Sequence, residues 1–196
     1  MTVTAMMSLR SYRPGYLRDA VDSLFAQTRP DWRLLGILDE AARRDVESVL
    51  GSRLDDPRME LIANEGRKLA GAFNTGMRHA RSDFVAILHG DDMWEPIAVE
   101  VLLANIATHP EVDFFHAARR FVNEDGEPIS DVVPSRPGVT LDDFGREGPV
   151  KHLLCWRREL ALAFGGIDET IPPVGPDDYD FFGPRDLCLP STVTIP

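Results

Sequence analysis

Short apolar runs alternate with helical apolar patterns through the first two thirds of this 196-residue chain, and this alternation strongly limits how it can fold. Each run has about the length of one strand, and each following segment carries apolar residues three or four positions apart, as on one face of a helix. Strands and helices in such alternation form a mostly parallel sheet flanked by helices. The pattern therefore predicts a Rossmann-like α/β domain.

The expected elements can be read from the same pattern. Strands are expected at residues 3–7, 32–38, 59–62, 84–88 and 112–117. Helices are expected between them, from about Tyr16 to Thr28, at 44–50, at 69–80 and from Pro96 to about His109. Pro96 would stand in the first helical turn, where a missing N–H costs nothing. Residues 84–88 are apolar throughout, which is typical of a central strand covered on both faces.

The character of the chain changes after residue 122. Residues 123–149 are rich in Gly, Pro and Asp and have little periodicity, so we expect a turn and then a long loop. A strand at 150–156 and a short helix at 158–164 follow. Residues 183–196 contain three prolines and no amphipathic pattern. We therefore expect one domain at 1–182 and an extended tail at 183–196.

The charge of the chain restricts its partners. Asp and Glu number 32 and Lys and Arg 21, which gives a net charge of −11, and no long basic run is present. Nucleic acid and anionic membrane surfaces are therefore not expected as partners. An anionic ligand would need a metal ion or a local cluster of donors to overcome the overall field.

The sequence also bears on cellular location. The two cysteines, Cys155 and Cys188, have no metal-ligand or disulfide-framework spacing, and the N-terminus lacks the basic and apolar regions of a secretion signal. No apolar stretch approaches the roughly eighteen residues of a transmembrane helix. These features favour a cytoplasmic location with no transmembrane segment.

Acidic residues follow apolar or turn segments at three places, namely Asp39-Glu40, Asp91-Asp92 and Asp177 to Asp180. Ligands of parallel α/β sheets bind at the carboxyl ends of the strands. Carboxylates gathered there repel one another unless a cation or a donor-rich ligand is present, which suggests a divalent metal with oxygen ligands. Taken singly, each cluster is explained as well by helix caps and turns.

Several motifs occur in a characteristic order. They are Val3–Met7 with residues 12–28, Asn64-Glu65-Gly66 with Asn74-Thr75-Gly76, residues 83–96, residues 112–115 with 123–129, residues 155–160, residues 165–169 and residues 177–180. In this order and spacing the chain resembles, over about residues 2–182, the inverting GT-A glycosyltransferases of family 2. The resemblance implies transfer of a sugar from a nucleoside-diphosphate sugar to an acceptor hydroxyl with inversion.

The resemblance also assigns roles to the acidic residues. Asp39 matches the residue that hydrogen-bonds the nucleotide base, and a carboxylate suits the ring N–H of uracil, so a UDP-sugar is slightly favoured. Asp91 and Asp92 match the D-x-D region, which holds Mn²⁺ or Mg²⁺ against the donor diphosphate and contacts the ribose. Such a metal would offset the diphosphate charge and stabilise the departing nucleotide.

Asp178 matches the general base of the family, which takes the proton from the acceptor hydroxyl. Asp177 stands where Glu is usual, and adjacent carboxylates can raise one another's pKa and so tune a base. The alternative for residues 177–180 is a solvated acidic loop.

Further positions depart from the family pattern, including Glu40-Ala41-Ala42, where Asp-Gly-Ser is usual. His89 replaces the first Asp of D-x-D; its imidazole could ligate Mn²⁺ but would hold Mg²⁺ less well, and the alternative is a half-buried histidine bonded to its neighbours. Residues 9–12 also differ from the usual motif. Arg10 is either a diphosphate contact or a surface arginine.

Other functions remain open at this point. One is a non-catalytic or degenerate module that binds a sugar nucleotide, and another is a nucleotidyltransferase, for which residues 9–15 are a poor glycine-rich basic loop. The acceptor is unknown. Relatives usually continue beyond the late acidic motif, and a partner subunit, a lost C-terminal segment or a degenerate enzyme would each explain the shorter acceptor side. The partner options are a homo-oligomer or a partner subunit.

Overall fold

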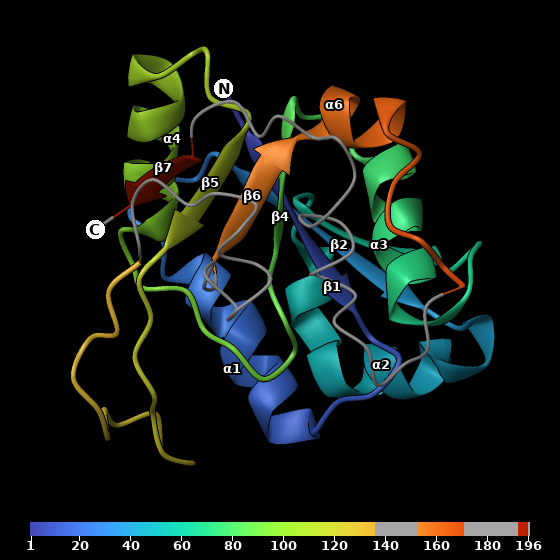
Figure 1. Ribbon diagram of the computed structural model, residues 1–196. Coiled ribbons are helices and arrows are strands. Elements are labelled where there is room, and N and C mark those ends of the chain that lie inside the picture. The colour runs from blue at the N-terminus through green and yellow to red at the C-terminus, as the bar shows by residue number, and fades with distance from the viewer. Residues whose placement is uncertain (136–152, 171–191, 196) are drawn as a thin grey trace.

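One seven-stranded sheet forms the centre of the computed structural model, which describes residues 1–135, 153–170 and 192–195 (Figure 1). The strands are β1 (Val3–Ser8), β2 (Trp32–Leu38), β3 (Met59–Ala63), β4 (Phe84–Ile87), β5 (Phe114–Ala117), β6 (Leu154–Arg157) and β7 (Thr192–Ile195). Their order in the sheet is β3-β2-β1-β4-β6-β5-β7. Strand β6 is antiparallel to both β4 and β5, and the other pairs are parallel. The expected mostly parallel sheet is confirmed.

Helices cover both faces of the sheet (Figure 1). They are α1 (Pro14–Phe25), α2 (Arg43–Leu50), α3 (Lys68–His79), α4 (Ala98–Thr108) and α6 (Arg158–Ala163). Side chains alternate across β1, so that Ala5 and Met7 pack with α1, α2 and α4, whereas Met6 packs with α3 and α6. Every residue of β4 is buried, as expected for a strand covered on both faces.

Several element boundaries differ from the sequence-based expectation because turns occupy the ends. The first helix ends at Phe25, and the N–H of Thr28 instead donates to the carbonyl of Pro96. Helix α4 begins at Ala98, so Pro96 precedes the helix and does not lie in its first turn. The N–H of Val112 donates to His109 in a turn, and β5 starts only at Phe114.

The later segments are partly described. The expected turn at 123–126 is present: Asn123 Oδ1 accepts the N–H groups of Asp125 and Glu127, and Gly126 has a φ of +79°. Most of the expected loop at 123–149, and the first residues of the expected strand at 150–156, lie outside the described residues. Within the expected tail, residues 192–195 form β7 and pair with β5.

None of the helices within the described ranges has the length and apolar composition needed to cross a bilayer.

Candidate functional site

The carboxyl ends of strands β1, β2 and β4 lie at the same end of the sheet. The parallel register places Ser8 beside Ile37 and Met6 beside Ile87. Backbone hydrogen bonds continue past the strands, from Leu9 N–H to the carbonyl of Ile37 (2.7 Å) and from Leu88 N–H to that of Met6 (3.1 Å). The segments that carry Arg10, Asp39 and residues 89–92 therefore all start from the same edge. The parallel strands thus bring the starts of these segments to the same end of the sheet.

Asp39 follows β2 directly and occupies the N-cap position of the 3₁₀ turn Glu40–Ala42. Its carbonyl accepts the N–H of Ala42 at 2.8 Å, but its side chain makes no capping hydrogen bond. The carboxylate is exposed. The turn therefore uses the backbone of Asp39 and leaves its carboxylate available to a ligand.

Asp91 and Asp92 lie in a tight turn after β4, in which the N–H of Asp92 donates to the carbonyl of His89 at 3.2 Å. Asp91 is exposed and Asp92 is half-buried. Neither carboxylate has a hydrogen-bond or ion-pair partner in the part of the chain that the structure describes. The alternative interpretation, in which Asp91 and Asp92 only form a turn, explains the backbone hydrogen bond. It gives their carboxylates no function.

His89 is half-buried and packs against Phe73 of α3, with ring centroids 6.0 Å apart at an interplanar angle of 72°. This contact agrees with the reading of His89 as a packed histidine. Among the described residues no group of three or more His, Cys, Asp or Glu side chains could enclose a metal ion. His89, Asp91 and Asp92 therefore do not form a complete protein cage there.

The two carboxylates nevertheless fit a metal that is shared with a ligand. Mg²⁺ and related cations are commonly bound by one or two carboxylates together with substrate phosphates and water molecules. Asp91 and Asp92 carry such hard oxygen ligands, and within the described ranges neither is paired with a cationic side chain. A ligand and water molecules would have to complete the coordination.

Arg10 is exposed just after β1 and makes no hydrogen bond within the described ranges. Its loop lies close to the turn after β4, because a Cβ placed on Gly90 would lie 3.7 Å from the Cβ of Tyr12. Burial and the nearby Asp45 raise the pKa of Tyr12. The loop after β1 and the turn after β4 thus form adjacent walls of the site.

A polar network that sequence reasoning left without a role lies at the N-terminus of α3. Asn74 is buried; its Nδ2 donates to the Ile167 carbonyl (2.9 Å) and to Glu169 Oε1 (3.0 Å), and its Oδ1 accepts from the Ile167 N–H (2.8 Å). Glu169 Oε2 accepts the Arg67 N–H at 2.7 Å. These bonds lower the pKa of Glu169, with Asn74 as the main cause.

Close backbone packing supports this network. A Cβ on Gly71 would lie 2.4 Å from the carbonyl carbon of Gly66, and Lys68 adopts a φ of +58°. The motifs at 64–66, 74–76 and 165–169 were the available sequence signal, since each is polar or glycine-rich at fixed spacing. The network ties residues 166–169 to the loop after β3, at the same sheet edge as Asp39. The acidic segment with Asp177, Asp178 and Asp180 lies outside the described residues.

Comparison with known families identifies the chain. The model of glycosyl transferase family 2 matches residues 10–153. The chain belongs to glycosyl transferase family 2. This match contains Arg10, Asp39, His89, Asp91 and Asp92, whereas Asp178 lies beyond its end.

Individual relatives agree with this family. An uncharacterized glycosyltransferase of Haemophilus influenzae is 30% identical over 177 residues, which is 86% of this chain and 65% of that protein. The structure of S. aureus TarS in complex with UDP has a TM-score of 0.70 at 16% identity, with 100% of this chain and 61% of that chain covered. Mannosyltransferase PcManGT from Pyrobaculum calidifontis, solved with GDP-Man and Mn²⁺, has a TM-score of 0.60 at 19% identity, with 99% and 57% covered.

These structural likenesses confirm the expected GT-A fold. The chain spans less than two thirds of the length of the relatives named above.

Proposed function

We propose that this chain binds a nucleoside-diphosphate sugar together with Mn²⁺ or Mg²⁺ and transfers the sugar to an acceptor hydroxyl with inversion. The observation that carries the proposal is that Asp39, Asp91 and Asp92 all follow strands at the same end of the sheet, with carboxylates that have no partner among the described residues. Family membership and neighbours solved with UDP and with GDP-Man and Mn²⁺ support it.

Each residue has a distinct part in this proposal. Asp39 accepts a hydrogen bond from the nucleotide base, which slightly favours a UDP-sugar. Asp91 and Asp92 hold the cation and contact the ribose, and Arg10 contacts the diphosphate. Bound there, the cation would act as a Lewis acid that offsets the charge of the leaving nucleotide. This local compensation is needed in a chain whose net charge is −11.

Asp178 is the proposed general base. Its carboxylate would take the proton from the acceptor hydroxyl while the oxygen attacks the anomeric carbon on the face opposite the nucleotide. Attack from that face forms the new glycosidic bond as the bond to the diphosphate breaks, and the anomeric configuration inverts.

Calorimetric titration with UDP, GDP and dTDP, each with and without Mn²⁺, tests the nucleotide site. We expect one nucleotide to bind, and to bind more tightly with Mn²⁺, because the metal links the diphosphate to Asp91 and Asp92. Failure of all three under both conditions would remove the proposal.

The alternative from another class is a non-catalytic module that binds the sugar nucleotide without transfer. The sequence at His89 favours it, because a histidine stands where the family usually has the first carboxylate of D-x-D. Nucleotide release from the donor, measured with an acceptor panel, separates the two readings. Binding with no release under any acceptor would favour the module.

Asp91→Asn is expected to weaken Mn²⁺-dependent nucleotide binding by about ten-fold or more, since loss of one charged ligand costs roughly 1.5–3 kcal/mol. Binding without Mn²⁺ should change little. Asp83→Asn is the matched control, because Asp83 is exposed beside the opposite end of β4. Equal effects of the two variants on the Mn²⁺-dependent titration would contradict the assignment.

A further inference from the structure

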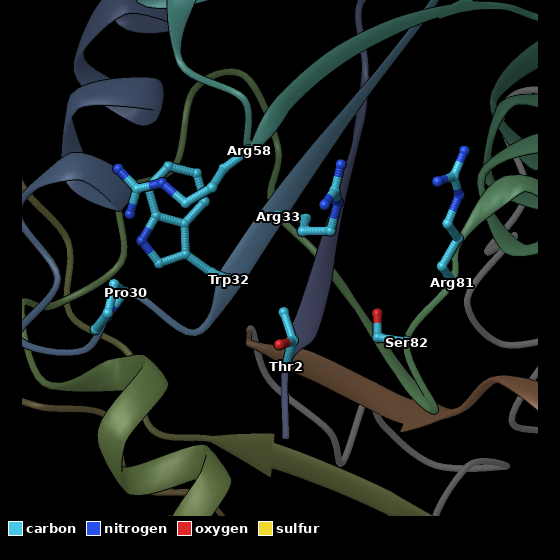
Figure 2. Close-up of a pocket in the computed structure, with 7 residues that line it drawn as sticks. All are labelled: Thr2, Pro30, Trp32, Arg33, Arg58, Arg81 and Ser82. Carbon is cyan, nitrogen blue, oxygen red and sulfur yellow. The ribbon is translucent and has the colours of Figure 1, made fainter.

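A hollow lies at the amino ends of the strands, at the end of the sheet opposite the proposed donor site (Figure 2). Its volume is about 360 Å³, and its lining includes Arg33, Arg58 and Arg81 with Trp32, Thr2 and Ser82. These residues precede or begin strands β1 to β4, so they lie at the amino ends of the strands. Asp39, Asp91 and Asp92 follow the carboxyl ends, so neither the carboxylates nor the loops of the donor site contribute to this hollow.

Arg58 is the fixed and neutralised member of the lining. Its guanidinium lies over the ring of Trp32 (Figure 2), 3.9 Å from the ring centroid. It also donates to both carboxylate oxygens of Asp56, at 3.0 and 2.8 Å. This pairing lowers the pKa of Asp56 to about 2. Arg58 therefore forms a rigid wall, and its charge is already compensated.

Arg33 and Arg81 have no acidic partner among the residues that the structure describes. Within that part of the chain the side chain of Arg33 donates only to the carbonyl of Pro57, at 3.3 Å, and the exposed Arg81 makes no hydrogen bond or ion pair. No carboxylate is among the residues that line the hollow. In a chain with 32 acidic and 21 basic side chains, two such guanidiniums beside one hollow are a local reversal of the overall charge.

Guanidinium groups favour phosphate because their planar N–H donors match its oxygens. The hydroxyl group of Thr2 belongs to the same lining, whereas that of Ser82 is hydrogen-bonded to the hydroxyl of Thr4 (Figure 2). A volume of about 360 Å³ lies within the range of small-molecule sites, which is larger than a bare phosphate ion requires. We propose that this hollow binds a phosphate-bearing ligand through Arg33 and Arg81. Its phosphate comes either from a free metabolite or from a phospholipid headgroup.

Calorimetric titration with inorganic pyrophosphate in EDTA tests the free source, and sedimentation with phosphatidylglycerol vesicles tests the lipid source. The double variant Arg33→Gln/Arg81→Gln should weaken binding of the active probe by at least about ten-fold. The control pair Arg18→Gln/Arg44→Gln removes the same charge from exposed arginines elsewhere, and it should change binding less than two-fold. Arg10→Gln reports any pyrophosphate that binds at the proposed donor site instead of the hollow.

The outcomes separate the sources and the site. Binding of pyrophosphate alone would assign a soluble ligand, and binding of vesicles alone would assign a phospholipid headgroup. Either result supports the proposal if the double variant no longer binds that probe. If neither probe binds, if the control pair loses as much as the double variant, or if Arg10→Gln abolishes pyrophosphate binding, the proposal is overturned. None of these results depends on whether the donor site transfers sugar.

Discussion

Replacement of Asp178 by Asn is expected to lower the rate of sugar transfer by about a thousand-fold, within the range by which a general base accelerates such reactions. Asparagine keeps the size of the side chain but cannot accept the proton of the acceptor hydroxyl. Nucleotide affinity should stay nearly unchanged, because the base acts in the transition state and not in donor binding.

The measurement is the transfer rate with saturating donor, alongside a calorimetric titration of the nucleotide and a thermal unfolding curve for each protein. A parallel loss of nucleotide affinity or of thermal stability would point to misfolding instead of lost base catalysis. Transfer at the original rate would show that another group takes the proton.

Asn74→Ala is expected to lower the free energy of unfolding by about 3 kcal/mol. The substitution removes the bonds to Ile167 and Glu169, and it leaves the N–H and carbonyl of the buried Ile167 without their partner. Urea denaturation measures the effect. Asn105→Ala is the control, since its side chain bonds only the Val101 carbonyl within α4, and a loss below about 1 kcal/mol is expected. Equal losses would mean that the network at Asn74 contributes no special stability.

Gly166→Ala tests the close approach between the backbone of Gly166 and the side chain of Asn74. Gly166 has a φ of +74°, and an added Cβ would lie 2.3 Å from Asn74 Oδ1. We expect a loss of about 3 kcal/mol in the natural background, from steric overlap and backbone strain together. In the Asn74→Ala background the overlap is gone, and only the strain of about 1 kcal/mol should remain. Additive effects in this cycle would contradict the close approach.

The first strands and helices were predictable because their apolar periodicity reports burial directly. Residues 32–38 match β2, and 84–88 match β4 to within one residue, since each is bounded by polar or turn residues. Because these strands run in the same direction, Asp39, Asp91 and Asp92 all start from the same end of the sheet. Apolar periodicity predicted the boundaries of α4 and β5 less well. At Pro96 and Val112 the backbone makes turn hydrogen bonds, and the helix and the strand begin only after them.

The remaining features depend on contacts between distant residues. Asn74 and Ile167 lie 93 positions apart, so no local pattern shows that one amide satisfies the backbone of the other. The environment of His89 is set by Phe73 of α3, which the D-x-D comparison does not include. The pairing of β7 with β5 likewise joins a segment without amphipathic pattern to the edge of the sheet.

The position of β6 has a consequence for the order of synthesis. Strand β6 separates β4 from β5, although β5 follows β4 in the sequence and β6 comes later than both. When residues 1–117 have left the ribosome, the place beside β4 is still empty, and the fully apolar Phe84–Ile87 presents an open edge. An open apolar edge can pair with another chain and aggregate. The nascent chain is therefore most exposed to aggregation until residues 154–157 are made and close the gap.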